Sequence, residues 1–208
     1  MGIIRDKALK SAINNQLRTS KELINEGRIV IENQFKIAHK KLMSSFNSHP
    51  VTVELKRGAD SSNVSGSLPE GNLFGFIGFE SGDDPLAQVE ILLSRANILI
   101  KNRKFGSFGF IWTYAVNIPT LSELYKVTPL PWAKGASWLQ QLEGRGIANL
   151  GQYMFTQSPP AGRSKAGIQS GRKSGGTLRI KYIKPLLEDF EENLNNMSGA
   201  TRISKSYF

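Results

Sequence analysis

Apolar residues recur at steps of three, four or seven through residues 1–47, and no other feature constrains the fold as strongly. The members of this stripe are Ile13, Leu17, Ile24, Ile31, Phe35, Ala38, Leu42 and Phe46. Helices in domains usually run to about 8–20 residues, so one small core cannot cover a stripe of this length. We therefore expect one long helix over 1–47, weakest at Gly27, that also packs on other subunits. The residues expected at that oligomer interface are Leu17, Ile24, Ile31 and Phe35.

Beyond His49-Pro50 the helical period gives way to alternation and to short helix signals. Alternating apolar residues predict strands over 51–55, 73–79, 108–118 and 178–183, and the strand over 108–118 is expected at the centre of the sheet. Asp84-Pro85 predicts a helix start, and Thr120 with Glu123 has the spacing of a capping box. Two further helices are expected, one stopped by Gly144 and one opened by Pro185.

These elements predict an α+β fold with a long N-terminal helix, an antiparallel β-sheet with short helices, and a C-terminal strand and helix. We expect a single domain over 1–197. It comprises the helix over 1–47, the sheet with helical insertions over 50–156, a basic flexible loop over 157–176, and the strand and helix over 177–197. A polar tail follows over 198–208.

Positive charge is concentrated near the C-terminal end of the chain. The formal net charge is +10, and between Glu143 and Glu188 there are eight Lys or Arg residues and no acidic residue. The candidate contacts with DNA or with a protein partner are Arg163, Lys165, Arg172, Lys173, Arg179 and Lys181. Long Gly/Ser/Pro-rich segments of this kind either carry a function or are solvated linkers. Two interpretations therefore stay open: an arm that contacts DNA or an acidic neighbouring subunit, and a loop whose charge only aids solubility.

No constellation of residues predicts catalysis or a bound cofactor. The chain has no cysteine, and its two histidines, His39 and His49, lack the spacing of a zinc pair. The segment around Lys173-Ser174 resembles a phosphate-binding loop, but Arg172 replaces the glycine before the lysine and no apolar strand precedes it. We therefore expect a protein that is not an enzyme, without metal or cofactor. No apolar run reaches about 18 residues and the first residues lack the layout of a signal peptide, so we expect no membrane span and no leader.

Four short segments resemble one family of viral proteins. They are the Ser65-Gly-Ser-Leu68 turn, the phrase Leu130-Pro-Trp-Ala-Lys-Gly-Ala-Ser-Trp138, the helix-then-glycine segment from Ser137 to Gly146, and Tyr182-Ile-Lys-Pro-Leu-Leu-Glu188. With the long N-terminal helix, their order is similar to that of bacteriophage neck and tail-completion proteins of the gene-10 type. The chain departs from that pattern in its longer basic loop and in Glu143-Gly144, which lacks an intervening aromatic residue.

This resemblance implies a structural virion protein of the head–tail junction, assembled in the host cytoplasm. Members of the family form closed rings, commonly of six subunits, between the portal or adaptor and the tail-terminator or tail-tube proteins. DNA passes through such a ring and could meet its basic residues without sequence specificity. The alternative, from composition alone, is a non-catalytic basic nucleic-acid-binding protein.

Overall fold

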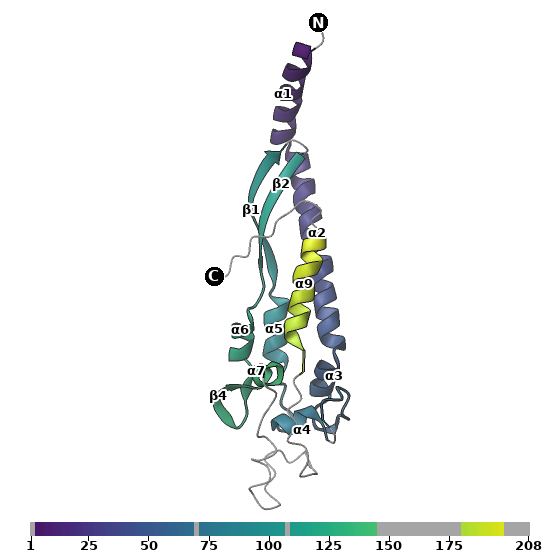
Figure 1. Cartoon of the computed structure of the whole chain (residues 1–208), viewed down its shortest axis with the longest axis vertical. Coiled ribbons are helices and arrows are strands. Elements are labelled where there is room, and N and C mark those ends of the chain that lie inside the picture. The colour runs from purple at the N-terminus through teal and green to yellow at the C-terminus, as the bar shows by residue number, and fades with distance from the viewer. Residues whose placement is uncertain (1–2, 69–70, 107–108, 145–179, 198–208) are drawn as a thin grey trace, which may run out of the picture. The chain divides into compact units, whose positions relative to one another are not determined.

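A computed structural model describes residues 3–68, 71–106, 109–144 and 180–197 of the chain (Figure 1). It confirms the α+β class. The chain divides into two compact units. Residues 1–40, 97–117 and 191–208 form what we term the ribbon unit, and residues 41–96 and 118–190 form the helical unit. The expectation of a single domain over 1–197 stays a prediction.

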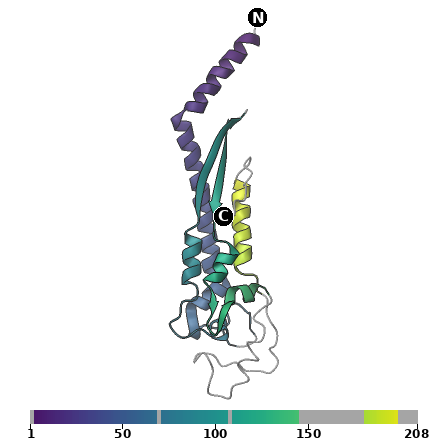
Figure 2. The ribbon, with the colours of Figure 1, turned by 90° about the vertical axis from the view of Figure 1, so that its left-hand side faces the viewer.

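The N-terminal helix is interrupted, which corrects the prediction of one helix over 1–47. Helix α1 spans Ile3–Thr19 and helix α2 spans Lys21–Ser48, and the chain changes direction between them (Figure 2). Ser20 lies at the break and caps α2, because its Oγ accepts a hydrogen bond from the Leu23 amide at 3.3 Å. Thr19 donates its hydroxyl to the carbonyls of Asn15 at 3.1 Å and Gln16 at 3.2 Å, and the Gln16 carbonyl is one of the last four of α1, which lack an amide partner within the helix.

The ribbon unit contains an antiparallel hairpin of strands β1 (Asn97–Gly106) and β2 (Gly109–Asn117). The strand predicted over 108–118 is therefore confirmed as β2 for its described residues. Its predicted place at the centre of a sheet is wrong, because β1 and β2 form a two-stranded sheet in the described chain. The register shifts between Ile100 and Asn102, which leaves Lys101 as the extra residue of a β-bulge.

Gly27, predicted to weaken the helix, allows the hairpin to approach it. A Cβ added at Gly27 would lie 2.7 Å from Cζ2 of Trp112 and 2.9 Å from Cε2 and Nε1 of the same ring. These distances are shorter than van der Waals contact, so only glycine admits the indole against α2 at this point. The helix runs through Gly27 without a break, so we infer that packing against Trp112 offsets the low helix propensity of glycine.

Two predicted strands in the helical unit are helices, which corrects the expectation over 51–55 and 73–79. Helix α3 spans Pro50–Arg57, where Pro50 takes the first turn and the ring of His49 accepts from the Val51 amide at 3.2 Å. After the short 3₁₀ helix η1 (Gly58–Asp60), helix α4 spans Leu73–Ile77. Asn72 caps α4 and Gly78, with φ of 95°, ends it in the left-handed conformation. Apolar runs of this length do not distinguish a strand from a buried helix.

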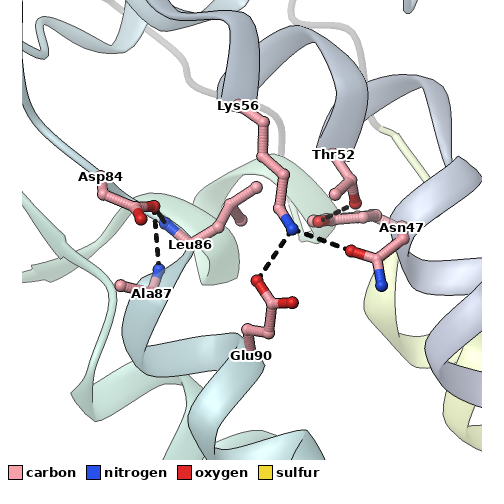
Figure 3. Close-up of polar contacts among 8 residues, drawn as sticks. Asn47, Thr52, Lys56, Asp84, Leu86, Ala87 and Glu90 are labelled. Atoms are coloured by element: carbon pink, nitrogen blue, oxygen red, sulfur yellow. Dashed lines mark hydrogen bonds and ion pairs between the residues drawn. The ribbon is translucent and has the colours of Figure 1, made fainter.

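The predicted short helices are present, although the one expected to start at Asp84-Pro85 begins at Ala87, with Leu86 in the N-cap position. Helix α5 spans Ala87–Ser94 and follows Asp84, whose Oδ1 accepts from the amides of Leu86 and Ala87, both at 3.1 Å (Figure 3). Helix α6 (Leu121–Lys126) has the capping box of Thr120 and Glu123. Strands β3 (Pro129–Leu130) and β4 (Ala133–Ser137) form a second small sheet. Helix α7 spans Trp138–Glu143 and ends at Gly144.

The last described element is helix α9, Ile183–Met197. The strand predicted over 178–183 is wrong for its described residues, because 180–182 form no strand and α9 begins at Ile183. The helical unit has a large apolar core. Its fully buried side chains include Phe46, Leu55, Phe74, Ile77, Leu86, Leu93, Leu124, Trp138, Leu139 and Tyr182. Lys56 joins three helices of this unit, because its Nζ lies 2.8 Å from Asn47 Oδ1 and 2.8 Å from Glu90 Oε2 (Figure 3).

Candidate assembly surface

Exposed apolar side chains gather in the ribbon unit rather than in the helical unit. Of the large apolar side chains that are exposed in the described chain, all but Val64 and Ile91 belong to the ribbon unit. Proteins rarely leave many such groups in water on one compact unit unless the surface is covered by a partner. The ribbon unit is therefore the candidate site of assembly.

Helix α2 carries two apolar stripes within the ribbon unit. The first contains Phe35 and Ala38, which are 7% and 1% exposed, and belongs to the stripe recognised in the sequence. The second contains Leu23, Val30 and Ile37, which are 43%, 51% and 61% exposed and follow one another at intervals of seven residues. Residues seven apart lie on one face of a helix. Leu9, Ile13 and Leu17 are also exposed, at intervals of four on α1. We call these six residues the assembly face.

The residues predicted at the oligomer interface fall into three environments. Leu17 is exposed and belongs to the assembly face, and its place at an interface stays a prediction. Ile24 and Ile31 are half-buried, and Phe35 is buried and stacks on His39 with ring centroids 5.7 Å apart. Phe35 is therefore covered by its own chain. The outer stripe of Leu23, Val30 and Ile37 was missed because the longer inner stripe dominates the sequence period.

The hairpin adds two exposed apolar residues on one of its faces. Leu99 pairs with Ala115 and Lys104 pairs with Ile111, so these four share a face. Leu99 is 49% exposed and Ile111 is 53% exposed. On the other face, Tyr114 is buried and Trp112 meets Gly27. One face of the hairpin thus covers α2, and the other presents apolar and cationic side chains to solvent.

The predicted basic contacts lie mainly outside the described residues. Arg163, Lys165, Arg172, Lys173 and Arg179 belong to the segment 145–179, which the structure does not describe. Lys181 is described, and it is exposed. The Ile180 amide donates to the Leu142 carbonyl at 3.1 Å, and the Lys184 amide donates to Glu143 Oε1 at 2.8 Å. These bonds hold the start of α9 to the end of α7.

A polar cluster anchors the same end of α9 to α3. Tyr182 and Thr52 are both 0% exposed, and their hydroxyl oxygens are 2.6 Å apart. Burial raises the pKa of Tyr182, so this phenol stays protonated. The ring of His49 packs on Tyr182 at a centroid distance of 4.7 Å. Burial lowers the pKa of His49, and a hydrogen bond to the backbone of Lys181 opposes this shift. His49 is a neutral cap here, so its surroundings favour a structural role.

Glu54 is a buried carboxylate that organises the neighbouring turn. It is 0% exposed, and its Oε2 accepts from the Ser65 amide at 2.7 Å. Its Oε1 accepts from the amide of Leu73, the first residue of α4. Glu54 therefore fixes the Ser65-Gly-Ser-Leu68 turn, where Gly66 has φ of 60°, to the start of α4. The two backbone donors compensate the cost of burying the charge.

Within the described ranges, no three His, Asp or Glu side chains come together as a possible metal site. None of the helices in the described part is long and apolar enough to cross a membrane. Comparisons with protein-family models, with curated proteins and with solved structures found no match.

Proposed function

We propose that this chain is a structural component of a phage head–tail junction, where copies of it form a closed ring that joins the DNA-filled head to the tail. The observation that carries the proposal is the assembly face, which presents apolar residues along α1 and α2. The short segments that resemble neck and tail-completion proteins indicate that the assembly is the head–tail junction.

A second copy of the chain is the occupant that we propose for the assembly face. The inner stripe of α2 packs within its own chain, whereas Leu23, Val30 and Ile37 remain 43–61% exposed on the same helix. A helix with apolar residues on two faces can pack one face on its own chain and the other on a neighbouring subunit. In a ring, the same contact is repeated from each subunit to the next. Burying one large apolar side chain contributes about 1.5–3 kcal/mol, so a few residues per contact are enough to bias assembly.

The proposed role in joining heads to tails can be tested by interrupting the gene for this chain in the phage that encodes it. The proposal expects filled heads and finished tails to accumulate separately in electron micrographs, because the junction that joins them is missing. Wild-type protein supplied from a plasmid should restore joined particles, which controls for effects on neighbouring genes. Complete, infectious particles without the protein would contradict the proposal.

A non-catalytic nucleic-acid-binding protein is the second candidate. It is favoured by eight Lys or Arg residues without an acidic residue between Glu143 and Glu188. The two candidates differ in their products when the gene is interrupted. A protein that acts on DNA without joining heads to tails should leave particle morphology intact and change DNA content instead.

A further inference from the structure

A second acid-free stretch of the chain lies on the hairpin. Residues 91–122 contain four Lys or Arg residues and no Asp or Glu. Three of them, Lys101, Arg103 and Lys104, fall within four consecutive positions of β1, and all three are exposed. This cluster is separate from the basic segment 145–179.

The aromatic residues of β2 hold the central cation in place. Arg103 pairs with Trp112 across the hairpin, and its guanidinium carbon lies 5.8 Å from the centre of that ring and 5.2 Å from the centre of Phe110. Such cation–π contacts orient the guanidinium plane without neutralising its charge. Arg103 therefore remains able to donate hydrogen bonds to an anion while its side chain is already ordered, which lowers the entropy cost of binding.

The register set by the bulge at Lys101 places the neighbouring cations on both faces of the hairpin. With Lys101 as the extra residue, Arg103 shares a face with Trp112, and Lys104 shares the opposite face with Ile111. Asn102 and Thr113 pair on the same face as Lys104 and add neutral polar groups. Lys101 and Lys104 are three positions apart on β1, and because the bulge shortens this part of the strand they stand less than about 10 Å apart along it.

We propose that the hairpin is a site for the phosphate backbone of duplex DNA, with Lys101, Arg103 and Lys104 as the contacting cations. Contacts to phosphate require no base sequence, so a cluster of exposed cations on the hairpin is sufficient for such binding. As a statement about DNA inside a junction, the inference rests on the proposed function. The binding itself needs only the purified chain, so its failure would leave the joining experiment above unaffected.

Another explanation for the same charges is protection of a sheet edge. In the described chain each strand of the hairpin pairs with the other strand alone, and lysines on such edges discourage unwanted pairing. Edge protection predicts aggregation when the charges are removed and no dependence of DNA binding on them. The stacking of Arg103 favours DNA binding over edge protection, because a residue that protects a strand edge needs a charge but no fixed orientation of its side chain.

The test is the affinity of the purified full-length chain for a mixed-sequence DNA duplex of about 30 base pairs, measured by fluorescence anisotropy at several salt concentrations. The triple variant Lys101→Gln/Arg103→Gln/Lys104→Gln should bind about 10–100-fold more weakly at about 0.1 M salt. Its slope of log affinity against log salt should fall by about 2–3, since each lost phosphate contact removes about 0.9. The matched control, Lys21→Gln/Lys36→Gln/Lys40→Gln, removes the same charge from exposed positions of α2.

Two results would overturn the inference. The first is a triple variant at Lys101, Arg103 and Lys104 with the affinity and salt slope of the wild type; if that variant also fails to join heads to tails, the cations bind an acidic protein partner. The second is a control variant that loses as much DNA affinity as the triple variant. A further variant, with Arg163, Lys165, Arg172 and Lys173 changed to Gln, measures any separate contribution of the segment 145–179 to the same slope.

Discussion

Replacing Gly27 by alanine tests whether the hairpin packs on α2 as described. In an exposed helix this change stabilises a protein by about 1 kcal/mol, because alanine has the higher helix propensity. Here the new Cβ would lie 2.7–2.9 Å from three atoms of the Trp112 ring, so the ring or the helix must move. Overpacking of this kind costs about 1–3 kcal/mol. We therefore expect Gly27→Ala to leave stability unchanged or to lower it by up to about 2 kcal/mol.

The decisive comparison is the same substitution in a Trp112→Ala background. Without the indole no steric conflict arises, so Gly27→Ala should then stabilise the chain by about 1 kcal/mol. The coupling between the two sites should thus be about 1–3 kcal/mol. Urea unfolding followed by far-ultraviolet circular dichroism measures all four proteins without depending on the lost tryptophan. Equal stabilisation by Gly27→Ala in both backgrounds would refute the close packing of Trp112 on α2.

Three further predictions concern other parts of the chain. Val30→Asp or Leu17→Asp should lower the mass of the assembled protein in sedimentation velocity, whereas Asn33→Asp, which adds the same charge at an exposed polar position, should not; equal masses would show that the assembly face is not an interface. Because burial lowers the pKa of His49 from 6.5, its contribution to stability is complete above about pH 6.5 and is lost as pH falls below it. The urea midpoint should therefore drop more between about pH 7.5 and 5.5 in the wild type than in His49→Asn, and parallel curves would contradict this. Glu54→Ala should cost about 2–5 kcal/mol in urea unfolding, since it leaves two backbone donors unsatisfied; a cost below about 1 kcal/mol would exclude the anchoring role.

The helices marked by capping residues could be predicted from the sequence. Two such signals are the capping box of Thr120 and Glu123 and the dipeptide Asp84-Pro85. Each predicts a helix because a side-chain oxygen accepts hydrogen bonds from amides that have no partner in the first turn. Asn72 and Gly78 carry the same kind of signal for α4, but the apolar residues between them also fit the pattern of a strand. Ser20 likewise carries a capping signal that the continuous apolar stripe outweighed.

The candidate site was predictable only in part, because exposure depends on tertiary packing. The spacing of apolar residues in α2 predicts which of them share a face of the helix, but it does not predict which face is covered by the same chain. Phe35 and Val30 are both apolar residues of one helix, yet the first is 7% exposed and the second 51%. The cations of β1 lie in an acid-free stretch of the sequence, but the charge excess over 145–184 is larger. The stacking of Arg103 on Phe110 and Trp112 follows from the hairpin register, which a bulge shifts.

The most direct test of the proposed function is the location of this chain in purified phage particles. Quantitative mass spectrometry should find it at the low copy number of a single ring, and gold-labelled antibody should mark one position between head and tail. Electron microscopy of the same particles then places the label relative to the portal vertex. Absence from the particles, or label distributed over the head or along the tail, would contradict the account.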